Sequence, residues 1–147
     1  LTALVHQRIA YVQRAEPGVW NGEQVLREGR GSCRDTSWLL VQILRRLGFG
    51  ARFVSGYLIE PAMLGRDDAE LLAGAVAYLP GAGWVGLDPT SGLLAGAGHI
   101  PLAAAPDPES AAPISGTVDP VETETRFEMV LRRLPEGMDL PMPQPFR

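Results

Sequence analysis

The residue best suited to chemistry in this 147-residue chain is its single cysteine, which lies in Gly31-Ser32-Cys33-Arg34-Asp35 directly before an apolar helical pattern. A serine followed three residues later by an acid predicts a capped helix start, with Cys33 as the first helical residue. Free backbone N–H groups and the positive end of the helix dipole favour an anion there, so we expect an easily formed thiolate. The pattern predicts a nucleophile, although a lone cysteine is often simply a small buried hydrophobe.

A carboxylate and an imidazole follow later in the chain. Asp88 ends the segment Gly83-Trp84-Val85-Gly86-Leu87-Asp88, and the next residues are Pro89 and Thr90. An aspartate in that context is frequently a turn or cap residue, but it could also face the start of the cysteine helix. His99 follows the glycine-rich stretch 93–98 and is the one histidine after Cys33. Its ring either reaches Cys33 as a base or has a supporting or surface role.

Composition restricts the class of protein. The chain is 46% hydrophobic and carries a net charge of −4, which suits one domain with a substantial core. Its 13 cationic residues are all arginine and are scattered, so we expect no nucleic-acid binding. The long uncharged runs are interrupted by proline and glycine, so neither a membrane span nor a secretory leader is expected. One cysteine fits a reducing compartment, and we expect a cytoplasmic protein.

The first third of the sequence predicts helices. Apolar spacing from Leu1 suggests a helix that ends before Pro17-Gly18. Asn21 begins a second cap and a short helix through about Arg27. The main helix is expected from Cys33 to Leu47, with a left-handed stop at Gly48.

The rest of the sequence predicts antiparallel strands and irregular segments. Strands are expected at 51–59, 75–79 and 84–88, the last two joined as a hairpin, with a polar connection over 60–70. Further strands are expected at 100–104 and within 123–134, separated by an irregular loop over 105–120. Helices followed by antiparallel strands indicate an α+β domain over 1–134, with a proline-rich tail over 135–147.

Three segments in this order resemble the bacterial transglutaminase-like domain, whose family shares the papain-like cysteine protease architecture. They are Gly31-Ser32-Cys33-Arg34-Asp35, the stretch Leu47-Gly48 to Tyr57, and Tyr78-Leu79-Pro80-Gly81-Ala82-Gly83-Trp84 to Thr90. The resemblance covers roughly 11–104 and implies a Cys-His-Asp triad, with Cys33 on a helix and Asp88 on a strand. It implies attack on a peptide or protein amide through a thioester, with the Cys33 backbone N–H as an oxyanion donor. Arg34 and Asp35 match the motif as capping and supporting residues.

One position departs from the family pattern. The triad histidine is expected six residues before Tyr78, but the chain has Leu72-Ala73-Gly74-Ala75-Val76-Ala77-Tyr78. The family context also predicts a histidine at position 99, in addition to the triad member. Leucine cannot transfer a proton, and general acid–base catalysis contributes about 10²–10⁴-fold. His99 is therefore the remaining candidate base.

Two functional hypotheses follow from these residues. The domain is either an impaired acyl transferase or protease with Cys33, Asp88 and His99 as catalytic residues, or an inactive pseudoenzyme that binds or supports other molecules. An engineered scaffold with a simplified active strand fits the second hypothesis equally well. Neither a metal nor another cofactor is expected, and the sequence leaves the oligomeric state open.

Overall fold

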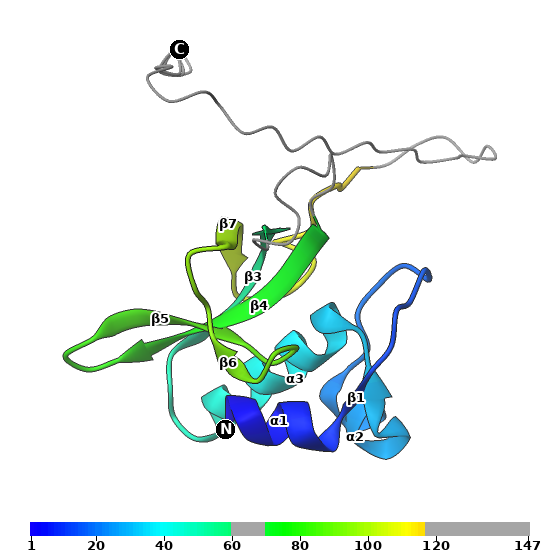
Figure 1. The fold of residues 1–147 in the computed structure, drawn as a ribbon, viewed down its shortest axis with the longest axis horizontal. Helices are drawn as coiled ribbons and strands as arrows, with labels where there is room; N and C mark the ends of the chain where they lie inside the picture. Colours follow the sequence, from blue (N-terminus) through cyan, green and yellow to red (C-terminus); the bar gives the residue numbers. More distant parts are fainter. Residues whose placement is uncertain (60–69, 117–147) are drawn as a thin grey trace, which may run out of the picture.

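The computed structural model describes residues 1–59 and 70–116 of the chain. In these residues, three helices lie together beside an antiparallel sheet, as Figure 1 shows. The strand expected within 123–134 and the proline-rich tail lie outside the described residues. The α+β class expected from the sequence is confirmed for the part of the chain that is described.

The N-terminal helix is shorter than the sequence predicts. Helix α1 spans Thr2–Arg8, and strand β1, Ala10–Tyr11, then pairs in parallel with β2, Arg30–Gly31. The helix ends because Ile9 is extended and buried, and β-branched and aromatic residues after it suit a strand. The prediction of a helix continuing toward Pro17 is therefore wrong. Helix α2, Gly22–Glu28, begins at the expected Asn21 cap, where the side chain accepts a bond from the Gln24 N–H.

The main helix, α3, spans Cys33–Arg46 and confirms the predicted cap at Ser32 and Asp35. The chain leaves it through Leu47 and through Gly48, whose φ of +88° is favourable only for glycine. Leu40 and Val41 are fully buried against the sheet. Facing them are three alanines of one strand, whose small side chains let the helix lie close to the backbone. These are Ala73, Ala75 and Ala77.

The main sheet has the strand order β6-β5-β4-β3-β7. Its strands are β3 (Ala51–Leu58), β4 (Glu70–Leu79), β5 (Gly83–Asp88), β6 (Leu93–Leu94) and β7 (His99–Ala105). All neighbouring pairs are antiparallel. The predicted strands at 51–59, 84–88 and 100–104 and the predicted hairpin are thus confirmed to within a residue or two.

Strand β4 begins earlier than the sequence predicts. It starts at Glu70 rather than Ala75, because pairing with β3 extends from Ala51–Ala77 to Leu58–Glu70. Alanine and glycine have weak strand propensity, so this early half carries little signal in the sequence. Glu70, expected in the polar connection over 60–70, is therefore the first residue of β4. The other residues of that connection lie outside the described residues. After β7, residues 106–116 contain neither helix nor strand, as expected for this part of the predicted loop.

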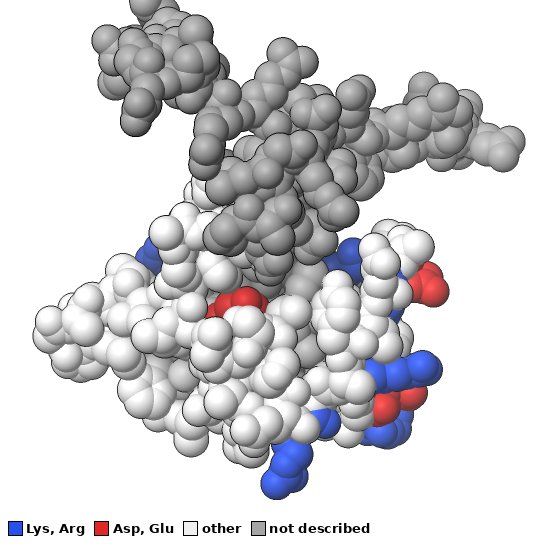
Figure 2. Space-filling model, in the orientation of Figure 1, with Lys and Arg blue, Asp and Glu red and all other residues white. Residues whose placement is uncertain are grey.

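Charged residues are unevenly distributed over the described surface. Figure 2 shows most of them on the side of the three helices, whereas the β4–β5 hairpin is almost uncharged. At the hairpin, exposed Tyr78 and Trp84 make an edge-to-face contact with ring centroids 5.5 Å apart. Among the described helices, none has the length and apolar character needed to cross a membrane.

Candidate functional site

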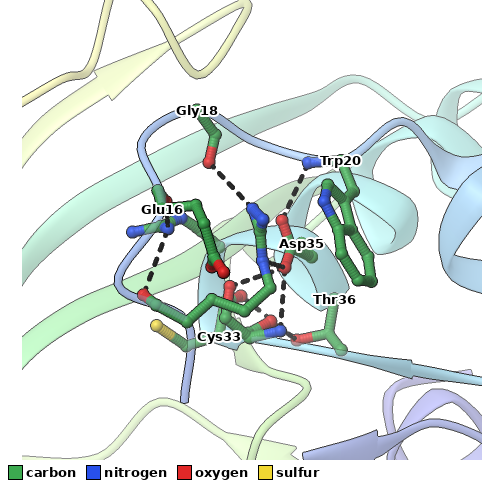
Figure 3. A network of polar contacts seen from close by, with 9 residues as sticks. Glu16, Gly18, Trp20, Cys33, Asp35 and Thr36 are labelled. Atoms are coloured by element: carbon green, nitrogen blue, oxygen red, sulfur yellow. Dashed lines mark hydrogen bonds and ion pairs between the residues drawn. The ribbon is translucent and has the colours of Figure 1, made fainter. Parts of the chain in front are cut away.

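Asp35 organises the start of helix α3. Its carboxylate is completely buried, and Oδ2 accepts bonds from the Ser32 N–H at 2.9 Å and the Ser32 hydroxyl at 2.7 Å. The same oxygen lies 3.1 Å from Nε of Arg14, while Oδ1 accepts the Trp20 N–H at 2.8 Å. Figure 3 shows this network, with the Cys33 sulfur pointing away from it. The supporting role expected for Asp35 is therefore confirmed.

The same network fixes the chain that runs past the cysteine. The Arg14 guanidinium stacks over Trp20 at 4.3 Å from the ring centroid, and its Nη2 bonds the Gly18 carbonyl. Arg34, the residue after the cysteine, donates to the carbonyl oxygens of Arg14 and Glu16. Segment 14–20 is therefore held against the helix start by two residues that directly follow Cys33. Sequence reasoning missed Arg14 and Trp20, because nothing in their local pattern indicates a partner 15 to 21 residues away.

Cys33 opens into a cleft of about 890 Å³. Segment 14–20 contributes Gly18 and Val19 to its wall, and residues 107–113 contribute to the lining as well. Its other described lining residues are largely aromatic and aliphatic. They include Trp38, Phe53, Tyr57, Leu71, Leu72 and Leu102.

The helix start is attached directly to strand β4. The buried Ser37 hydroxyl donates to the Ala73 carbonyl at 2.9 Å, and the Ala73 backbone is close enough to the Cys33 thiol to lower its pKa. The thiol therefore lies next to the strand position at which the family pattern expects a histidine. Leu72 occupies that position and lines the cleft.

The environment of the thiol opposes ionisation. Burial raises the pKa of Cys33 above its ordinary value, and the charge of Asp35 adds to this effect. Backbone hydrogen bonds at Ala73 and Arg34, together with the Arg34 charge, lower the pKa but do not compensate. The sequence-based expectation of an easily formed thiolate is thus wrong, because burial outweighs the favourable helix terminus.

Asp88 and His99 form a pair. His99 Nε2 lies 3.4 Å from Asp88 Oδ2, and their side chains are 17% and 5% exposed. The other carboxylate oxygen, Oδ1, accepts the Thr90 N–H at 2.8 Å. Burial alone would raise the pKa of Asp88, but hydrogen bonds from Ser91, Thr90 and His99 hold it below its ordinary value.

The described contacts do not join this pair to the cysteine. In residues 1–59 and 70–116, neither His99 nor Asp88 lines the Cys33 cleft, and neither bonds the thiol. The structure thus brings Asp88 and His99 together, whereas Cys33 lies in a cleft that Leu72 also lines. Within the same residues, no cluster of three or more His, Cys, Asp and Glu side chains could hold a metal ion.

Comparison with known proteins places this arrangement in a family. A family model described as the transglutaminase-like superfamily matches residues 1–89 of the 147. The chain belongs to the transglutaminase-like superfamily. This match spans Cys33, Leu72 and Asp88, and it confirms the family membership expected from the sequence.

A solved structure is also similar to this transglutaminase-like domain. It is that of a candidate cysteine protease from Cytophaga hutchinsonii, with 25% sequence identity and a TM-score of 0.61. The match covers 76% of this chain and 36% of the other, so this chain spans about a third of that protein's length. The papain-like fold expected from the sequence is therefore confirmed. No curated protein matches the chain.

Proposed function

We propose that this transglutaminase-like domain binds a peptide segment in the Cys33 cleft without turning over unactivated amides. The observation that carries the proposal is that Leu72 lines the same cleft as Cys33, at the position where the family pattern places the proton-transferring histidine. The raised pKa of the thiol supports it. A protonated thiol beside a hydrocarbon side chain is a poor nucleophile.

The acyl-transfer step requires two proton movements. The thiol must lose its proton as sulfur bonds the amide carbon, and the departing amine must gain one as the C–N bond breaks. The carboxylates among the described cleft residues are Asp107 and Glu109. Hydrogen bonds from the Ser110 backbone and hydroxyl lower the pKa of Asp107, which makes that carboxylate a weaker base still. Neither movement therefore has a suitable partner in the described cleft.

The cleft itself favours binding. Its volume lies in the range typical of ligand sites, and it combines apolar walls with a few polar groups. A peptide is the occupant we propose, since the solved neighbour is a candidate cysteine protease. Apolar side chains would pack against Trp38, Phe53 and Leu72.

A second function is acyl transfer from an activated donor, such as an aryl ester. As the S–C bond forms and the ester C–O bond breaks, the aryloxide leaves without prior protonation and the thiol proton passes to bulk water. Water or an amine then resolves the thioester. The position of the partly buried Cys33 in the cleft wall favours this function, because the sulfur remains accessible to a bound donor.

Kinetics with paired substrates tests both functions. A reporter peptide anilide and the matching aryl ester would be incubated with the wild type, Cys33→Ser and Leu72→His, with Leu71→His as the control in the same cleft. We expect no Cys33-dependent anilide hydrolysis by the wild type, and a gain of about 10²-fold or more in Leu72→His but not in Leu71→His. Wild-type anilide turnover that disappears in Cys33→Ser would overturn the binding proposal.

Alkylation and binding measurements complete the test. The iodoacetamide rate of Cys33 should rise with pH to a midpoint above the ordinary thiol value of 9.0. A midpoint below 8 would contradict an unactivated thiol.

A capped apolar hexapeptide should shift the backbone NMR signals of Cys33 and Leu72, whereas Leu72→Glu should weaken this binding because it places a charge in an apolar wall. Unchanged signals at millimolar peptide would count against binding.

A further inference from the structure

The connection between β6 and β7 joins opposite edges of the main sheet. Four residues, 95–98, separate Leu94 from His99. In a flat five-stranded sheet these edges would be about 19 Å apart, at about 4.8 Å per strand spacing. Five residue steps span at most about 18 Å when fully extended. The sheet must therefore curl so that its two edges approach.

Backbone contacts hold this connection across the curled sheet. Ala95 N–H donates to Gly86 of β5 at 2.9 Å, and Gly98 accepts a bond from Ile59, directly after β3, at 2.8 Å. The connection is also turned rather than extended, because His99 N–H donates to the Gly96 carbonyl at 3.0 Å. It thus passes from β5 to β3, and β4 lies between those two strands.

The His99 ring adds a side-chain bond at the end of the connection. Its Nδ1 accepts the Gly96 N–H at 3.1 Å, so this nitrogen must present a lone pair. The proton of the neutral ring then belongs on Nε2, which faces Asp88 Oδ2 at 3.4 Å. Both ring nitrogens are engaged, and neither is left to accept a proton from a thiol.

We infer that His99 is a positioning residue that holds the Asp88 carboxylate and fastens the start of β7 to the end of β5. Strand β7 contributes Leu102 and Ala103 to the Cys33 cleft, so this contact fixes one wall of the cleft. The inference rests on the proposed function, in which no histidine serves as the base. In this account His99 does not transfer protons but maintains the shape of the binding cleft.

A double-mutant cycle with a spectroscopic readout tests the inference. Unfolding by urea would be measured for His99→Ala, Asp88→Asn and the double variant, with His6→Ala, at the exposed other histidine, as the control. We expect the double variant to raise the unfolding equilibrium constant by less than the product of the two single effects, with a difference of about fivefold or more. His99→Gln, whose amide can still donate to the carboxylate, should recover part of the loss.

Nitrogen-15 NMR of the ring separates positioning from a merely packed histidine. For the neutral ring we expect the proton on Nε2, and this signature should change in Asp88→Asn. The apolar hexapeptide should bind His99→Ala more weakly than the wild type, because the β7 wall of the cleft is no longer held to Asp88. Additive stability effects, an Nδ1–H ring or an unchanged peptide affinity would each overturn the inference. Anilide turnover by the wild type would instead refute the proposed function, so the two failures are distinguishable.

Discussion

Substitution of Asp35 tests the network that supports the cysteine. In Asp35→Asn the side chain keeps its shape but loses its charge, which leaves the Arg14 side chain, only 8% exposed, without its ion-pair partner. The amide also has a single acceptor oxygen, whereas the carboxylate accepts from donors on two sides through its two oxygens. The N–H group of the new amide must then face at least one of the N–H donors that the carboxylate accepts in the wild type.

The expected magnitude follows from the burial of this pair. Removal of one partner from a buried ion pair typically costs about 3–5 kcal/mol. A domain of this size has a stability of about 5–15 kcal/mol, so the loss is a large fraction of the total. At about 2–4 °C per kcal/mol, the melting temperature should fall by about 6–20 °C.

Urea and thermal unfolding monitored by circular dichroism would measure this loss. Glu28→Gln is the control, because its contacts with Arg27 and Arg30 are exposed and should contribute within about 0.5 kcal/mol. The Arg14→Ala change should cost less in the Asp35→Asn background than in the wild type. A loss below about 1 kcal/mol in Asp35→Asn, or full additivity with Arg14→Ala, would refute the reasoning.

Two further predictions concern the sheet. Because its pKa is lowered in the folded state, Asp88 stabilises the fold above its ordinary pKa of 3.8, and this contribution is lost as the pH falls through the folded-state value. Urea unfolding between pH 6 and pH 2 should therefore show a smaller acid-induced loss in Asp88→Asn than in the wild type; equal slopes would contradict the assignment. At Gly56 a Cβ would lie 2.0 Å from the Ile100 carbonyl oxygen, so Gly56→Ala should destabilise the domain by about 1–3 kcal/mol. Gly96→Ala, where nothing lies within 4 Å of the added carbon, is the control, and a similar stability of the two variants would count against the contact.

Local signals in the sequence were sufficient for several elements. The Ser32–Asp35 cap, the Asn21 cap and the stop at Gly48 depend on interactions within a few residues, so their patterns predict them directly. The β4–β5 hairpin is similarly local, since its strands are joined by a glycine-rich turn. In contrast, α1 and the first half of β4 were predicted with wrong bounds, because pairing with distant strands decides where they end and begin.

The sequence by itself determined the family, the place of Cys33 at a helix start and the absence of a histidine at position 72. These depend on residue identity and order, which folding does not alter. Only the tertiary structure decided that Asp35 accepts Arg14 and Trp20, that the thiol is disfavoured as an anion, and that His99 pairs with Asp88. Burial and contacts between distant segments arise from the packed chain, so no local pattern contains them. The sequence predicts an activated nucleophile in Gly31-Ser32-Cys33-Arg34-Asp35. In the tertiary structure this segment is fixed by the Asp35 network and lies at a largely apolar cleft, where ionisation of the thiol is disfavoured.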